Sequence, residues 1–214
     1  NRAELLVSRT LPLVLQQTHT DVEIIVVGDA MDEAEMAILR TVRDRRVKII
    51  NLRKRGKYPK TLPELWFVAG SKPMNKGLRL AKGAWICRFD DDDSPRPDFI
   101  EKSLQWCRAN NLEFVSSPYI IFDEHGHEVK QVGPRDSPKQ IGGHATWFYR
   151  SSLSVIRYSR LSWAKTYDRP TDRDRASRLN RYRVTTGLMS EPCVEVHPRP
   201  GNANIGLAQH WEEN

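Results

Sequence analysis

A short apolar segment that ends in four consecutive aspartates sets the strongest constraint on the fold of this chain. Residues 84–89 (Ala-Trp-Ile-Cys-Arg-Phe) have the length and composition of a buried strand, and the aspartates of residues 90–93 follow directly. Adjacent carboxylates repel one another, and raised pKa values relieve that repulsion only in part. A divalent cation relieves it, because hard cations such as Mg²⁺ bind carboxylate oxygens. The alternative is a solvated acidic turn before a helix that begins near Pro97.

The segments around this strand predict a layered α/β fold. Residues 22–27 and 47–51 are β-branched and nearly continuously apolar, as in parallel strands that are covered on both faces, and residues 32–44 between them have helical spacing. Strand, helix and strand at this spacing indicate βαβ units. In an open sheet of this kind ligands bind at the carboxyl ends of the strands, where residues 90–93 would lie.

Other elements follow from local patterns. We expect a helix at residues 3–17 that is kinked or restarted at Pro12, a short helix at 73–82, and a helix from Pro97 to residue 109. Residues 113–122 predict a strand and residues 124–127 a turn, whose two histidines bind a metal or, more simply, face solvent. The basic loop 53–60 either faces phosphates or is a solvated surface loop.

Composition bounds the class of protein. The chain has 214 residues, of which 39% are hydrophobic and 29% charged, so it is expected to form one soluble domain. Within it we expect two halves, residues 1–123 and residues 124–214. Cys87, Cys107 and Cys193 lack metal-ligand spacing, which predicts core thiols in a reducing compartment. No apolar run is long enough to span a bilayer and no signal-peptide pattern occurs, so the cytoplasm is expected.

The chain is basic, with 34 Lys and Arg against 27 Asp and Glu and a net charge of +7. A basic surface suits phosphates on nucleotides, on nucleic acid or on anionic lipid headgroups, and charge alone does not choose among them. The residues of the candidate site must therefore distinguish among these three kinds of phosphate.

A second informative segment runs from Pro170 to Leu179. Thr171 and Asp174 have the spacing of a capping box, which predicts that a helix begins there and gives Asp174 a structural role. If Asp172 points into the cleft that holds the metal, its carboxylate can act as a general base toward an attacking hydroxyl.

These motifs, taken in order, resemble the inverting glycosyltransferases of family 2, which have the GT-A fold. The resemblance rests on Val26-Val27-Gly28-Asp29, on Asn75-Lys76-Gly77, on residues 85–93, and on the segment from Thr171 to Arg178, which is similar to the family's Glu-Asp-x-Asp-(x)3-Arg. It implies a mixed, mostly parallel nucleotide-binding sheet flanked by helices. Asn1-Arg2 resemble the end of the family's first strand and turn, so that strand is expected to be missing.

The resemblance also implies roles for single residues. Asp29 would bind the nucleotide base, normally uracil, and Asn75 would lie beside the nucleotide or cap a helix. Asp91 would reach the ribose and Asp92 the metal, Mg²⁺ or Mn²⁺. The register of this pair is uncertain by one residue, so that Asp90 is the alternative ligand.

Three more candidates belong to the second half of the chain. Asp172 aligns with the catalytic base of the family. His144 and Trp147 would line the acceptor or donor sugar, although a core role for Trp147 is equally consistent with the pattern. His197 would be a further metal or diphosphate ligand, or a structural histidine at a strand end.

The implied activity is metal-dependent transfer of one sugar, with inversion, from a nucleoside-diphosphate sugar to a saccharide or lipid-linked acceptor. A UDP-sugar donor is expected, as is a place in surface polysaccharide or glycoconjugate synthesis, at the inner face of the membrane and without nucleic acid. Ala30-Met31 replace the family's usual Gly-Ser, which leaves the base open. Gln209-His210-Trp211 departs from the Gln-x-x-Arg-Trp of processive synthases, which favours single addition.

Three alternatives remain at this point. A nucleotidyltransferase that makes nucleotide sugars would need a Gly-rich phosphate loop after the first strand. A basic nucleic-acid-binding module would need exposed aromatics and no acidic cluster. A relative of the transferases that binds nucleotide sugar without turnover would keep the same motifs.

Overall fold

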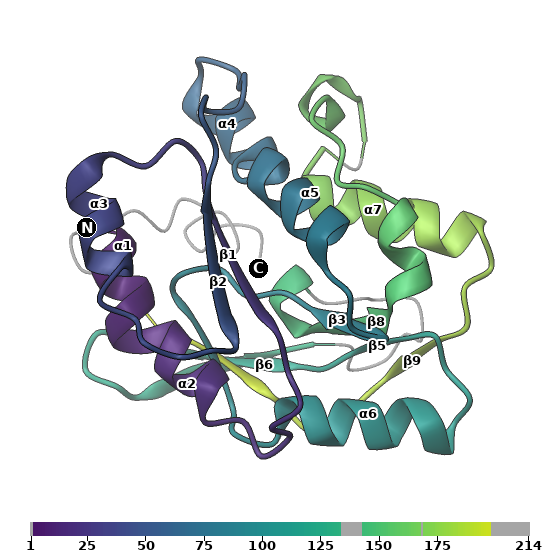
Figure 1. The fold of residues 1–214 in the computed structure, drawn as a ribbon. Helices are drawn as coiled ribbons and strands as arrows, with labels where there is room; N and C mark the ends of the chain where they lie inside the picture. Colours follow the sequence, from purple (N-terminus) through teal and green to yellow (C-terminus); the bar gives the residue numbers. More distant parts are fainter. Residues whose placement is uncertain (1, 134–142, 168, 198–214) are drawn as a thin grey trace.

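The computed structural model describes residues 2–133, 143–167 and 169–197 as three β-sheets with helices packed around them (Figure 1). The predicted first helix is present in three pieces: α1 (Arg2–Leu5), η1 (Leu6–Thr10) and α2 (Leu11–Leu15). Pro12 has no N–H and its ring crowds the carbonyl four residues before it. The chain accommodates it with the wider π turn of η1, in which the Leu11 N–H donates to Leu6 O.

A parallel pair of strands follows. β1 (Ile24–Gly28) pairs with β2 (Val47–Asn51), and α3 (Glu33–Leu39) connects them. Asp32 and Glu35 form a reciprocal capping box at the start of α3. The helix ends five residues before the predicted boundary, because Asp44 binds the backbone N–H and the guanidinium of Arg46 and so stabilises a local turn instead.

Two helices that lead into the next sheet are α4 (Leu62–Val68) and α5 (Ser71–Leu80). The sequence predicted only the second. They are separated by Gly70, whose φ of 72° is in the left-handed region that favours glycine. This residue lets the chain end one helix and begin another within three residues.

The central sheet has the order β3-β8-β5-β9. Its strands are short: β3 (Trp85–Cys87), β8 (Trp147–Arg150), β5 (Phe114–Ser116) and β9 (Thr186–Leu188). β8 is antiparallel to both β3 and β5, whereas β9 is parallel to β5. The sheet is therefore mixed, as expected, but the prediction that its pairs are mostly parallel is wrong here, because β8 is antiparallel to both of its neighbours.

Helices cover both faces of this sheet. α6 (Phe99–Ala109) lies on one face, and α5 and α7 (Thr171–Arg181) lie on the other (Figure 1). Side chains alternate between the faces, so that Phe114 and Tyr149 pack toward α5 and α7 and Val115 and Phe148 pack toward α6. Both clusters are buried, and together they form the core.

The third sheet has the order β4-β10-β6-β7. It consists of β4 (Asp93–Pro95), β10 (Val194–Val196), β6 (Tyr119–Phe122) and β7 (Glu128–Val132). The single strand predicted at 113–122 is two strands in different sheets, because the chain changes direction at Ser117-Pro118. There the Ser117 N–H donates to Thr146 O, and Pro118 has no N–H with which to continue a ladder.

Three short 3₁₀ turns complete the second half of the chain: η2 (His144–Thr146), η3 (Ser151–Val155) and η4 (Ser162–Ala164). Strands from the second half of the sequence lie between strands from the first half. β8 lies between β3 and β5, and β10 lies between β4 and β6. Within the described residues, no helix combines the length and apolar character needed to cross a lipid bilayer.

Candidate active site

Asp29 follows β1 at its carboxyl end, and both of its carboxylate oxygens accept hydrogen bonds from the basic loop. The Gly56 N–H donates to Oδ1 at 3.0 Å and the Tyr58 hydroxyl donates to Oδ2 at 2.5 Å. Burial and the neighbouring Asp29 raise the pKa of the Tyr58 phenol, so the hydroxyl stays protonated and donating. A base N–H that binds Asp29 would share the carboxylate with these two donors.

The turn after Asp29 contains an unusual backbone conformation. Ala30 has a φ of 63°, in the left-handed region, where a Cβ is crowded by the following carbonyl. Asn51, at the end of β2, holds the turn by bonding the N–H and the C=O of Met31 at 2.9 and 2.8 Å. The residue that departs from the family pattern is thus the one under strain.

The four aspartates lead from the end of β3 into β4, and arginines contact Asp90 and Asp91. Arg88 and Asp90 form an ion pair, and Arg2 binds both oxygens of Asp91. Asp93, the first residue of β4, accepts the Asp90 N–H at 2.5 Å. We refer to residues 90–93 as the acid run.

The acid run is crowded enough to shift its own titration. Burial raises the pKa of Asp91 to about 6, although Arg2 opposes the shift. Burial, together with Asp90 and Asp92, raises the pKa of Asp93 to about 7. Burial acts the same way on Asp90, but Arg88 and His144 outweigh it and hold the pKa of Asp90 below its usual range.

The acid run suits a divalent cation in its donor chemistry. Its carboxylate oxygens are the hard ligands that Mg²⁺ and Mn²⁺ prefer, and their mutual repulsion is what a cation would neutralise. Among the described residues, however, no three His, Cys, Asp or Glu side chains converge on one point. Asp90 and Asp91 are turned toward Arg88 and Arg2 instead, so they would have to leave these arginines to close around a cation.

Two predicted histidines lie near the acid run. His144 Nε2 is 3.2 Å from Asp90 Oδ2, and its buried Nδ1 has no partner among the described residues. His197 follows β10, whose last residue pairs with Asp93, and it stacks on Phe122 at 4.7 Å. Its Nε2 lies 3.3 Å from Glu195, an arrangement that fits the structural alternative.

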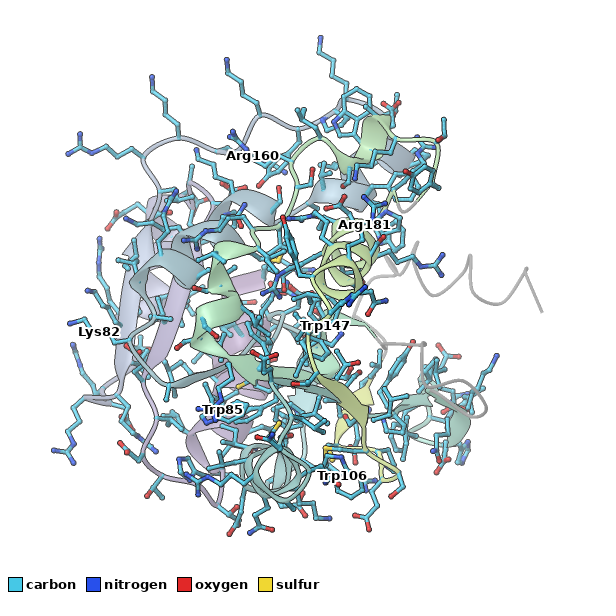
Figure 2. The ribbon with its side chains drawn as sticks, turned by 90° about the vertical axis from the view of Figure 1, so that its right-hand side faces the viewer. Lys82, Trp85, Trp106, Trp147, Arg160 and Arg181 are labelled. Carbon is cyan, nitrogen blue, oxygen red and sulfur yellow. The ribbon has the colours of Figure 1, made fainter. Side chains whose placement is uncertain are left out.

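Trp147 lies in the core and not at the site. It is 1% exposed, at the start of β8, with its ring 5.3 Å from that of Phe114. Figure 2 shows it inside the molecule, between the elements that surround it. Its faces are already covered, which corrects the expectation that it lines a sugar; of the two candidates from this stretch, only His144 reaches the acid run.

Asp172 lies in the first turn of α7 and is half-buried. Its Oδ1 accepts the Arg173 N–H at 2.8 Å, and its charge adds to burial in raising the pKa of Tyr119, at the start of β6. β6 and β4 belong to the same sheet with β10 between them, so Asp172 and the acid run border one sheet.

The helix predicted at Thr171 begins there, but the capping box is wrong. The Thr171 hydroxyl donates to Ser159 O at 2.8 Å rather than capping α7. Asp174 is 1% exposed and binds Lys165 and Arg178, the latter at 2.7 Å. Two cations compete successfully for the carboxylate that would have completed the box.

Asn75 is in the middle of α5 and does not cap a helix. Its Nδ2 donates to Tyr158 O at 2.8 Å and its Oδ1 accepts the Tyr158 N–H at 2.9 Å. Behind Tyr158 lies Arg175, fully buried, with its guanidinium 4.4 Å from the ring centre of Tyr149 and its Nε donating to Ile156 O. This network fixes the chain that leads into α7.

Sequence reasoning missed the cations and the phenol that bind the predicted carboxylates. Arg88 carried a signal, because an arginine inside an apolar strand beside aspartates needs a partner. Arg2 and Tyr58 carried none, since they are separated from Asp91 and Asp29 by 89 and 29 residues. Gln209-His210-Trp211 lies outside the described residues.

Residues 69–162 match the model of glycosyl transferase family 2, a span that contains Asn75, the acid run and His144. This part of the chain is similar to the glycosyl transferases of family 2. Among the similar proteins, the O-antigen biosynthesis glycosyltransferase WbnJ of Escherichia coli is 27% identical over 135 residues, covering 62% of this chain and 48% of WbnJ. The succinoglycan biosynthesis protein ExoO of Rhizobium meliloti is 32% identical over 124 residues, covering 54% of this chain and 32% of ExoO.

The fold of this chain is that of GT-A glycosyltransferases. TarS of S. aureus, crystallised as residues 1–349 with UDP, superimposes with a TM-score of 0.68 at 15% identity, covering 93% of this chain and 58% of that chain. The same protein with UDP-GlcNAc gives a TM-score of 0.66. The chain thus spans between about a third and three fifths of the proteins that it matches here.

Proposed function

We propose that this chain transfers a single sugar from a UDP-sugar to an acceptor hydroxyl, with inversion at the anomeric carbon, in the synthesis of a surface polysaccharide or another glycoconjugate. The observation that carries the proposal is that the acid run leads into β4 while Asp172 of α7 acts on Tyr119 of β6, two strands of one sheet. The likeness to TarS, which binds UDP and UDP-GlcNAc, supports the choice of donor.

In this mechanism Asp172 removes the proton of the acceptor hydroxyl while the hydroxyl oxygen attacks the anomeric carbon. The new C–O bond forms on the face opposite the departing UDP, whose bond to the same carbon breaks. Asp29 accepts an N–H of the base, and the Asn75 clamp on Tyr158 keeps α5 in register with the segment that leads into α7. The Tyr158 backbone occupies the Asn75 amide, so this residue positions the site and contacts nucleotide only if the clamp opens.

The negative charge of the leaving diphosphate would be stabilised by a cation bound to the acid run and by the arginines beside it. A bound Mg²⁺ or Mn²⁺, held by Asp92 with Asp90 or Asp91, would supply positive charge to the diphosphate. Arg2 and Arg88, released from the carboxylates that they bind in this structure, would add to it. His144 steadies Asp90, and His197 is a further candidate for the same diphosphate.

The remaining expectations concern the surroundings of the enzyme. The match of residues 69–162 to family 2 favours a glycosyltransferase over a nucleotidyltransferase, and an acidic site disfavours nucleic acid as the substrate. The three cysteines are free thiols, which supports a reducing compartment such as the cytoplasm. A saccharide or lipid-linked acceptor at the inner membrane face fits a basic chain similar to this family.

The decisive experiment measures nucleotide binding and turnover separately. Thermal stabilisation by UDP, GDP, dTDP and CDP, each with and without Mn²⁺, should single out UDP with metal. Asp92→Asn should remove the metal-dependent part of the shift, whereas Glu124→Gln, at the exposed β6–β7 turn, should keep it. The absence of any metal-dependent shift with all four nucleotides would refute the proposed donor site.

A second measurement separates an active transferase from a relative that only binds. Asp172→Asn should leave the UDP-dependent shift unchanged and abolish release of UDP in the presence of acceptor. Near-normal turnover in Asp172→Asn would exclude this residue as the base. Binding without turnover in the unaltered chain would assign it to the non-catalytic relatives.

A further inference from the structure

Two neighbouring elements expose large apolar side chains instead of burying them. Leu62 and Trp66 are 64% and 38% exposed, one helical turn apart on the same face of α4. Leu161 and Tyr167, which flank η4, are 70% and 62% exposed. Isolated exposed residues are ordinary, but four on two adjoining elements form a patch that calls for an explanation.

The two elements are packed together. α4 and η4 are in direct contact, and Arg169 bridges them: its guanidinium lies 4.6 Å from the ring centre of Phe67 in α4, and its Nε donates to Trp163 O in η4 at 3.0 Å. We call the surface formed by Leu62, Trp66, Leu161, Tyr167 and their neighbours the α4–η4 surface. Figure 2 shows Arg160, beside Leu161, at the opposite end of the molecule from Trp106.

Cations surround this apolar patch. The loop 53–60, which leads directly into α4, holds five Lys and Arg in eight residues, and all five are exposed. Arg160 adds another beside Leu161. Within α4 the acidic residue is Glu64, whose carboxylate accepts the Thr61 hydroxyl at 2.6 Å. The surface is therefore apolar at its centre and positively charged along one side.

The combination of aliphatic, aromatic and basic side chains selects the partner. Polynucleotide phosphates would use the cations and bases would stack on Trp66 or Tyr167, but Leu62 and Leu161 would gain nothing. An anionic bilayer uses all of them, because Leu and Trp enter the headgroup–acyl boundary while Lys and Arg stay with the lipid phosphates. We propose that the α4–η4 surface docks this chain onto membranes rich in anionic phospholipid.

The same loop joins the docking surface to the candidate active site. Gly56 and Tyr58, between the cations of the loop, donate the two hydrogen bonds that Asp29 accepts. This link between the surface and the site rests on the proposed function. A membrane that binds the cations of the loop would contact the same loop that binds Asp29, the residue proposed to bind the nucleotide base. Vesicle binding itself does not depend on catalysis, so either proposal can fail alone.

The test uses the chain in cosedimentation with lipid vesicles, without nucleotide or acceptor. Vesicles of phosphatidylcholine with about one third phosphatidylglycerol should bind it at least tenfold more tightly than pure phosphatidylcholine, and added salt should weaken the binding. Leu62→Ser with Leu161→Ser should lower the affinity about tenfold, as should Lys57→Gln with Lys60→Gln.

Matched variants change the same chemistry elsewhere. Val155→Ser with Val129→Ser removes two exposed apolar side chains from η3 and β7, which are 75% and 41% exposed. Arg43→Gln with Arg45→Gln removes two exposed cations at the other end of β2 from the loop. Both should bind anionic vesicles as the unaltered chain does, and an equal loss in either pair would overturn the proposal.

Tryptophan fluorescence tests whether Trp66 inserts into the bilayer. Brominated acyl chains should quench part of the tryptophan fluorescence in anionic vesicles, and Trp66→Phe should remove that quenching while leaving cosedimentation nearly intact. Equal binding to neutral vesicles would overturn the proposal. The proposal would also be overturned if the chain formed a dimer without lipid and the double variant Leu62→Ser with Leu161→Ser dissociated that dimer. The surface would then bind a second copy of the chain. Tighter binding to single-stranded RNA than to anionic vesicles would assign it to nucleic acid.

Discussion

The side chain of Asn75 bonds both backbone groups of Tyr158, 83 residues further along the chain, at 2.8 and 2.9 Å. A side-chain amide that pairs in this way takes the place of a neighbouring strand. It connects α5, within the segment that matches family 2, to the turn that leads into α7 and Asp172.

Asn75→Ala should lower the free energy of unfolding by about 2 kcal/mol. Two hydrogen bonds are lost, and the polar backbone of the buried Tyr158 is left without partners. Asn180→Ala, on the exposed side of α7, is the control and should change stability by less than about 0.5 kcal/mol. Urea denaturation of both variants checks this. A loss in Asn75→Ala no larger than in the control would contradict the clamp.

Ala30→Gly should raise the free energy of unfolding by about 1 kcal/mol. The φ of 63° crowds the Cβ of Ala30, and glycine has no Cβ to crowd. Ala37→Gly, on the exposed face of α3, should do the opposite, because glycine in a helix costs about 1 kcal/mol. Thermal unfolding of the pair should therefore show shifts of opposite sign. Shifts of the same sign would mean that the turn at Ala30 is not strained.

Asp174→Asn should destabilise the fold by about 3 kcal/mol, because it leaves Lys165 and Arg178 beside a buried neutral group. Asp172→Asn, two residues earlier on the same helix, should leave stability nearly unchanged while removing turnover. The comparison separates the structural carboxylate of this segment from the proposed base. Equal loss of stability in both variants would refute that division.

Tyr58→Phe should tighten UDP binding roughly fivefold, because it removes a hydrogen bond worth about 1 kcal/mol that competes for Asp29. Gly56→Ala should act in the same direction, since a Cβ on Gly56 would lie 2.3 Å from a ring carbon of Tyr58 and push the ring aside. Tyr182→Phe is the control, because Tyr182 follows the last residue of α7 and is 71% exposed. Calorimetric titration with UDP measures the affinity of each variant. Weaker binding in Tyr58→Phe would mean that the phenol helps to hold the nucleotide.

The three cysteines should react slowly with a thiol reagent at pH 8. Burial raises the pKa of Cys107 and of Cys193 to about 11 and that of Cys87 to about 12. Because the thiolate is the reacting form, the native rates should be at least about a hundredfold below those in denaturant, and should rise with pH toward these pKa values. Fast native labelling of any one of them would contradict its burial.

Several elements could be predicted because their signals are local. The β-branched residues of β2 and the amphipathic pattern of α6 placed both elements nearly at their observed bounds. The strand that ends in four aspartates was found for the same reason. Local patterns also placed the start of α7, although not the contacts of Thr171 and Asp174.

What could not be predicted depends on contacts that are distant in sequence. Nothing near Asp91 indicates Arg2, and nothing near Trp147 indicates that β8 enters the middle of a sheet and buries this ring. The division of one predicted strand at Ser117-Pro118 likewise follows from Thr146, which takes the Ser117 N–H. In each case a contact with a residue distant in sequence outweighed the preference of the local pattern.

The position of β8 between β3 and β5 also bears on how the polypeptide acquires its structure during synthesis. Until residue 150 has left the ribosome, β3 and β5 have no described neighbouring strand to bond, and β4 has none until residue 196 has been made. Pairing within these two sheets is then expected to be slow, because each sheet waits for a strand that lies far along the chain.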